Sequence, residues 1–136
     1  MNVLKLFVFL VVFGTYCHGQ VTQQELIGQW KVNRVVQKSP NAELRGVLEG
    51  FKSATFHFMD NGDFKLSTAS KAPTFQMLLR MTENAQWKFN AEGQHIKIGR
   101  EADGYSIMGI APSLNEGSMH FSMEESEMVF EMKKAQ

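Results

Sequence analysis

The sequence predicts an all-β protein: an eight-stranded antiparallel up-and-down β-barrel with a short N-terminal helix and a candidate lid helix. Three observations favour this class. Apolar and polar residues alternate along most of the chain, turn residues separate the alternating segments, and no crossover helices divide them. A meander of this length most easily removes its two edges by closing into a barrel.

Residues 1–19 are predicted to be a secretory signal peptide. Lys5 precedes the apolar run 6–13, which is too short to span a bilayer and is followed by small and polar residues. With cleavage after Gly19, residues 20–136 form the mature domain, which is exported, periplasmic or secreted, and has no integral membrane segment. An uncleaved membrane anchor is the alternative interpretation.

The mature chain is predicted to be one domain that needs no disulfide. Removing residues 1–19 from the 136 leaves 117, and no cysteine remains among them, so the core must hold the fold. Lipidation of Cys17 has little support, because Tyr16 stands where a lipidation signal has a small residue. Without Lys5, thirteen Lys and Arg face fourteen Asp and Glu, which argues against binding to nucleic acid.

The elements follow in order along the chain. Thr22 and Glu25 form a capping box for one short helix, which Gly28 ends. Turn residues at 60–63, 91–93, 101–104 and 114–117 then mark connections between strands. The strands are expected at 29–37, 53–59, 63–69, 85–90, 95–100, 104–111, 118–123 and 127–134.

Two stretches do not fit the meander. Residues 38–50 read as a long first loop. In residues 71–84, Phe75, Leu78 and Leu79 stand at i, i+3 and i+4, which indicates a short amphipathic helix, or alternatively an irregular strand. Such a helix would cap one mouth of the barrel, either as a lid or as ordinary packing.

Strand alternation separates an inner from an outer face. Arg34 is the only charged residue in the inner set, and the register of strand 104–111 is open because Met108 and Ile110 are apolar on its outer face. The inner set is Trp30, Val32, Arg34, Val36, Ala54, Phe56, Phe58, Phe64, Leu66, Thr68, Trp87, Phe89, Ile96, Ile98, Tyr105, Ile107, Met119, Phe121, Met123, Met128, Phe130 and Met132.

The residues also carry a resemblance to a known group. The short helix followed by IGQW at 27–30 resembles the Gly-x-Trp signature of the lipocalins and the wider calycin group. FHFMDNGDFKL at 56–66 and AQWKFNAEGQHIKI at 85–98 are similar to two hairpins of short bacterial lipocalin-like domains. The resemblance spans most of residues 22–134, but the lipocalin disulfide, second motif and C-terminal helix are missing.

The resemblance implies a structural role for Trp30 and a binding role for the lumen. Trp30 would plug the closed end of the barrel beside Lys133 or Lys134, a cation–π contact of about 0.5–1 kcal/mol when exposed. A barrel of eight strands is either filled by its side chains or holds one small ligand.

An amphiphilic ligand would need a head-group partner as well as an apolar wall. Arg34 could clamp a carboxylate or phosphate; alternatively it lies at the rim beside a glutamate, since an unpaired buried charge is costly. Arg80 is a second candidate for the head group. The apolar tail would lie along Phe56, Phe58, Met119 and Phe121.

Catalysis finds no support in the sequence, so we expect neither an enzyme, nor a cofactor, nor a metal site. His57, His95 and His120 fall on strands that are not neighbours in a meander. No nucleophile, base and orienting acid form a known motif.

Two functions from different classes are therefore predicted. The first is an exported lipocalin-like protein that binds a small hydrophobic or amphiphilic ligand in the barrel. The alternative is a filled-barrel envelope or interaction module that contacts a protein partner through loops 38–50 and 71–84. An isomerase or cyclase acting on a lipid inside the barrel is a weaker third.

Overall fold

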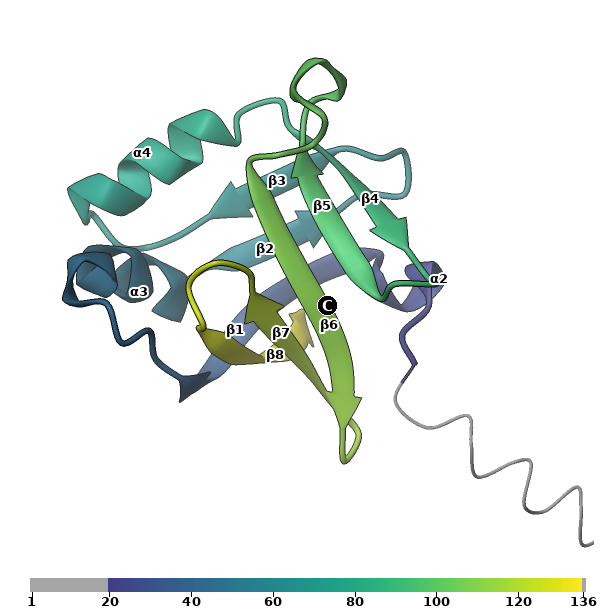
Figure 1. Cartoon of the computed structure of the whole chain (residues 1–136), viewed down its shortest axis with the longest axis horizontal. Coiled ribbons are helices and arrows are strands. Elements are labelled where there is room, and N and C mark those ends of the chain that lie inside the picture. Colours follow the sequence, from purple (N-terminus) through teal and green to yellow (C-terminus); the bar gives the residue numbers. More distant parts are fainter. Residues whose placement is uncertain (1–19, 136) are drawn as a thin grey trace, which may run out of the picture.

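The computed structural model describes residues 20–135, and the predicted signal peptide lies outside them. Eight antiparallel strands form a nearly closed barrel with a few short helices, which confirms the predicted fold class (Figure 1). The strands are β1 (Gly28–Gln37), β2 (Thr55–Phe58), β3 (Phe64–Ser67), β4 (Gln86–Asn90), β5 (His95–Gly99), β6 (Met108–Asn115), β7 (Ser118–Met123) and β8 (Val129–Ala135).

The strands pair as an up-and-down meander whose first and last members meet. The order in the sheet is β3-β2-β1-β8-β7-β6-β5-β4, so β1 pairs with both β2 and β8. β3 and β4 are the two ends of the sheet. Closure of the barrel therefore depends on the junction between these two strands, which we call the seam.

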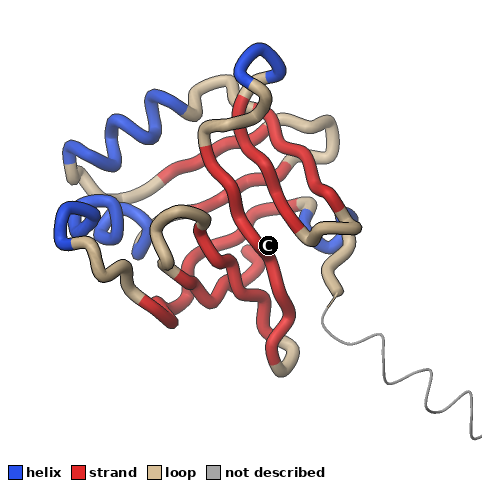
Figure 2. The backbone as a smooth tube through the Cα atoms, in the orientation of Figure 1, coloured by secondary structure: helices blue, strands red, loops and turns tan. Residues whose placement is uncertain are grey.

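Helices cover the ends of the barrel. α2 (Gln23–Leu26) begins at the predicted capping box, in which Thr22 accepts from the Glu25 backbone N–H. The two longest helices, α3 (Arg45–Lys52) and α4 (Pro73–Met81), lie side by side at the opposite end (Figures 1 and 2). Two single 3-10 turns, η2 (Ala42–Leu44) and η3 (Glu101–Asp103), complete the elements. None of the helices in residues 20–135 is long and apolar enough to cross a membrane.

The prediction of a plain loop at residues 38–50 was wrong, because η2 and most of α3 lie there. Leu44, Val47, Leu48 and Phe51 stand at i, i+3, i+4 and i+7, which is the spacing of one helix face. Leu48 and Phe51 from this face are buried in the core. The amphipathic helix predicted in residues 71–84 is present as α4.

β1 departs from strict alternation, so two of its residues were placed on the wrong face. Its register against β8 shifts between Val32 and Arg34 and again between Val35 and Gln37. Each bulge inserts one unpaired residue and reverses the faces that follow. Arg34 is consequently exposed, Val35 packs against the core, and Val36 is 41% exposed.

The sixth strand begins later than predicted, at Met108, and its inner residues are not Tyr105 and Ile107. The Asp103 carboxylate accepts from the backbone N–H groups of Arg100 and Ser106, which holds this stretch as a turn. Ile110 then points inward and is fully buried. This outcome settles the register that the sequence left open.

Candidate functional site

The seam is closed at one end only. Phe64 N–H donates to the Ala85 carbonyl at 3.0 Å, and Trp87 N–H donates to the Gly62 carbonyl at 2.9 Å. No further backbone hydrogen bond joins β3 to β4 within residues 20–135, and the chain between these two strands forms α4. The wall of the barrel is therefore open beneath the C-terminal half of α4.

A groove of about 630 Å³ occupies this opening. Its floor includes Phe64, Leu66 and Ala85, which belong to the buried core, and Leu79 of α4 forms part of its wall. We call this the seam groove. Its lining residues are Met59, Asp63, Phe64, Lys65, Leu66, Leu79, Thr82, Glu83, Asn84, Ala85 and Gln86.

α4 is held over the mouth of the barrel mainly by α3. The ring of Phe75 is fully buried and meets Phe51 of α3 edge-on, with 5.0 Å between centroids. Gly50 of α3 lies against the same ring, where any Cβ would overlap it. At the other end of α4, the Arg100 guanidinium donates to the carbonyls of Met81 and Glu83.

The lumen itself is filled with aromatic side chains. Phe56 lies within 6.4 Å, between centroids, of the rings of Phe51, Phe58, Phe64 and Phe121. Phe56, Phe58 and Phe121 have no measurable exposed surface, so a water molecule finds no room beside them. Met119 is also buried in this cluster. These four residues, predicted to contact a ligand tail, contact one another or other core residues.

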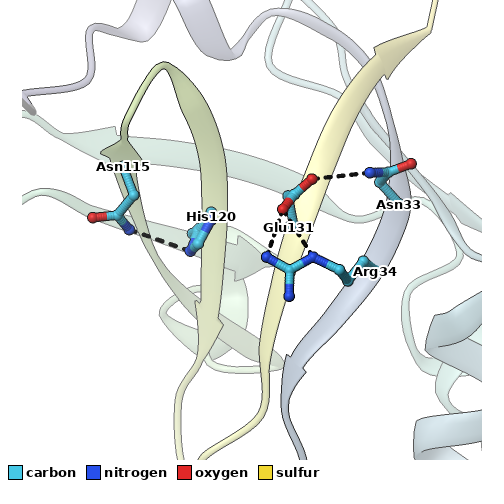
Figure 3. Close-up of polar contacts among 5 residues, drawn as sticks. All are labelled: Asn33, Arg34, Asn115, His120 and Glu131. Atoms are coloured by element: carbon cyan, nitrogen blue, oxygen red, sulfur yellow. Dashed lines mark hydrogen bonds and ion pairs between the residues drawn. The ribbon is translucent and has the colours of Figure 1, made fainter.

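The two predicted head-group residues do not meet at any common site. Arg34 donates to Glu131 on the outer face, at 2.8 Å from Nη2 and 3.1 Å from Nε, and Asn33 donates to the other oxygen of the same carboxylate (Figure 3). Arg80 is exposed on α4 and does not line the seam groove. Arg34 therefore has the glutamate partner of the second alternative, but the pair lies on the outer face of the β1–β8 ladder.

This cluster on the outer face gives a pH-dependent prediction. Hydrogen bonds from Asn33 and then Arg34 lower the pKa of Glu131 below its ordinary value. The stabilisation is therefore present above the unfolded pKa of about 4.3 and is lost as the pH falls through the lower folded value. Acid unfolding of Glu131→Gln should show a weaker pH dependence than wild type in this range, while Glu92→Gln on an exposed turn should match wild type. Equal curves for Glu131→Gln and wild type would contradict the assignment.

Trp30 lies at the end of the barrel opposite α3 and α4. Its indole N–H donates to the Leu26 carbonyl at 2.9 Å, and Lys134 Nζ lies 5.2 Å from the ring centroid. The same ammonium group donates to the Glu25 carbonyl at 3.0 Å. Of the two lysines considered from the sequence, Lys134 is the one over the ring, and these contacts join α2 to β8.

The histidines lie apart on the barrel. His95 Nε2 is 2.6 Å from Glu124 Oε1, and His120 Nδ1 is 3.2 Å from Asn115 Nδ2 (Figure 3). Within residues 20–135, no group of three or more His, Cys, Asp or Glu side chains is arranged to hold a metal ion.

Sequence reasoning missed the seam groove as a site. It considered the lumen and the two arginines, but not Lys65, Glu83 or Gln86 on the groove rim. One signal was available: the helix predicted in residues 71–84 separates the third and fourth strands, so a tight hairpin does not pair these two strands along their length. Comparison of the chain with known protein families, with curated proteins and with solved structures finds no match.

Proposed function

We propose that this protein is an exported, lipocalin-like binding protein, not an enzyme, and that it takes up a small hydrophobic or amphiphilic ligand through the seam groove. The observation that carries the proposal is the position of the groove. It lies at the one opening of the described barrel wall, and the core residues Phe64 and Leu66 form its floor. Sites for small molecules commonly have volumes of about 300–1,000 Å³, and the groove falls in this range with five apolar and six polar or charged lining residues.

The helices give the ligand a route from the groove into the barrel. Phe75 fills the mouth from α4, and α4 packs mainly on α3 rather than on the strands. An outward movement of α4 would carry both Phe75 and the groove residue Leu79 away from the core. The ligand site is then partly formed in the closed state and enlarges on binding.

A matched pair of tryptophan variants tests this proposal. Gln86 and Ser67 are both exposed, uncharged residues on the end strands, but only Gln86 lines the groove. Titration with the neutral fluorescent probe N-phenylnaphthylamine should show binding by wild type and Ser67→Trp. Gln86→Trp should bind at least about tenfold more weakly, a loss of 1.4 kcal/mol. Equal binding by both variants would contradict the groove as the site.

The second candidate is the filled-barrel interaction module. It is favoured by the packed lumen and by two exposed methionines on α4, Met77 at 55% and Met81 at 49%. Contiguous exposed apolar surface marks protein contacts, and Met77 and Met81 stand one helical turn apart on α4. This function predicts no uptake of the probe by wild type, together with a stoichiometric partner whose binding is lost in the double variant Met77→Gln/Met81→Gln.

A further inference from the structure

The rim of the seam groove does not favour an anionic head group. Asp63 and Glu83 contribute two carboxylates to the lining, and Lys65 contributes the single ammonium group. At neutral pH these three side chains carry a net charge of −1. Asn84 and Gln86 add two neutral carboxamides. Among the lining side chains, a carboxylate or phosphate placed here would face two carboxylates and one ammonium group.

No arginine lines the groove among residues 20–135. Arg100 stands outside the lining, and its guanidinium donates to the carbonyls of Met81, the last residue of α4, and of Glu83, a lining residue. Arg34 is paired with Glu131 elsewhere on the barrel. The groove thus lacks the planar fork of donors with which proteins most often bind a carboxylate.

The edge of β3 that faces the seam offers two backbone groups to a ligand, a hydrogen-bond donor and a hydrogen-bond acceptor. Antiparallel strands direct alternate residues toward opposite neighbours, and Phe64 donates across the seam. Leu66, two residues on, therefore directs its N–H and C=O away from β2 and toward the groove. No backbone hydrogen bond within the described part of the chain joins Leu66 to the far side of the seam. One donor and one acceptor are thus available on the groove floor.

We infer that the ligand of the seam groove is a neutral amphiphile whose head group is a hydroxyl or an amide. Such a head group accepts from the Leu66 N–H and donates to the Leu66 C=O, whereas a carboxylate only accepts. It also adds no charge beside Asp63 and Glu83. The inference rests on the proposed function, and it replaces the anionic head group expected from Arg34 and Arg80 with a neutral one.

Two ligands of equal chain length separate the outcomes: dodecanol and dodecanoate, each titrated into the mature protein below its aggregation threshold at pH 7.4. We expect dodecanol to bind at least tenfold more tightly. Tighter or equal binding of dodecanoate would overturn the neutral head group while leaving the groove as a binding site. Binding of neither would overturn the proposed function, and the head-group inference with it.

A charge variant tests the reason for the preference. Glu83→Gln removes one carboxylate from the rim and should strengthen dodecanoate binding by about two- to fivefold, with dodecanol unchanged. Glu92→Gln removes the same charge from an exposed turn outside the groove and should change neither affinity. An equal gain for dodecanoate in both variants would show that the preference reflects overall charge and would overturn the local argument.

Discussion

Replacing Phe56 with alanine is expected to destabilise the fold by about 3–5 kcal/mol. The ring is fully buried and contacts four other aromatic rings, which come from α3, β2, β3 and β7. Truncation leaves a cavity that all four neighbours would have to close. Urea unfolding of the variant measures the loss in free energy of unfolding.

Two further variants keep this prediction testable. Domains of this size have about 5–15 kcal/mol of stability in total, so Phe56→Ala could fail to fold. Phe56→Leu keeps most of the volume and should lose less. Met77→Ala removes an exposed side chain and should change stability by no more than about 0.5 kcal/mol. A Phe56→Ala variant as stable as Met77→Ala would contradict the packed lumen.

Gly50→Ala is expected to cost about 1–3 kcal/mol, because the new methyl group overlaps the Phe75 ring. The higher helix propensity of alanine opposes this by up to about 1 kcal/mol. The overlap should prevail, since the fully buried Phe75 ring can make room for the methyl group only if α4 moves and its contact with Phe51 is disturbed. Urea unfolding gives the net effect, and amide exchange over residues 73–81 should become faster as α4 is displaced.

Gly93→Ala is the matched control for this second prediction. Its new Cβ would find nothing closer than 3.8 Å, and it lies on an exposed turn. We expect a change within about 0.5 kcal/mol. If Gly50→Ala behaved in the same way, the close packing of α3 against α4 would be wrong.

The short-range patterns of the sequence predicted most of the strands. Turn residues at 60–63 and 114–117 fix local hairpins, and the alternation that follows them assigns the buried face correctly in β2, β3, β5, β7 and β8. Both kinds of signal lie within a few residues of the elements they determine. The sequence alone was therefore sufficient for the fold class and for the position of most of the core.

Departures from regular geometry were not predictable in the same way. The bulges that turn Arg34 outward depend on pairing with β8, almost a hundred residues later. α3 was missed because Gly46 and Gly50 weaken its helical pattern. Because Gly50 has no side chain, the ring of Phe75 from α4 can pack directly against the backbone of α3. β6 contains Pro112, which has no backbone N–H to donate. The pairing between β5 and β6 reaches only to Ile110, so the proline breaks no hydrogen bond with β5.

The candidate site was the least predictable part. The groove forms from two strand ends and one helix that meet only in the folded barrel. Its rim residues, such as Glu83 and Gln86, show no pattern that separates them from other exposed polar residues. The arginines that stood out in the sequence are instead paired or exposed elsewhere. The groove lies where the two end strands of the sheet meet, so its position follows from the strand order and not from a local sequence pattern.

Native mass spectrometry tests the central claim most directly, on the protein purified from its own host without detergent. The seam-groove proposal predicts a small-molecule mass that is retained by wild type and Ser67→Trp, released on denaturation, and missing from Gln86→Trp. A bare protein mass for all three, with no uptake of dodecanol or dodecanoate, would contradict ligand binding and leave the interaction module as the account of this barrel.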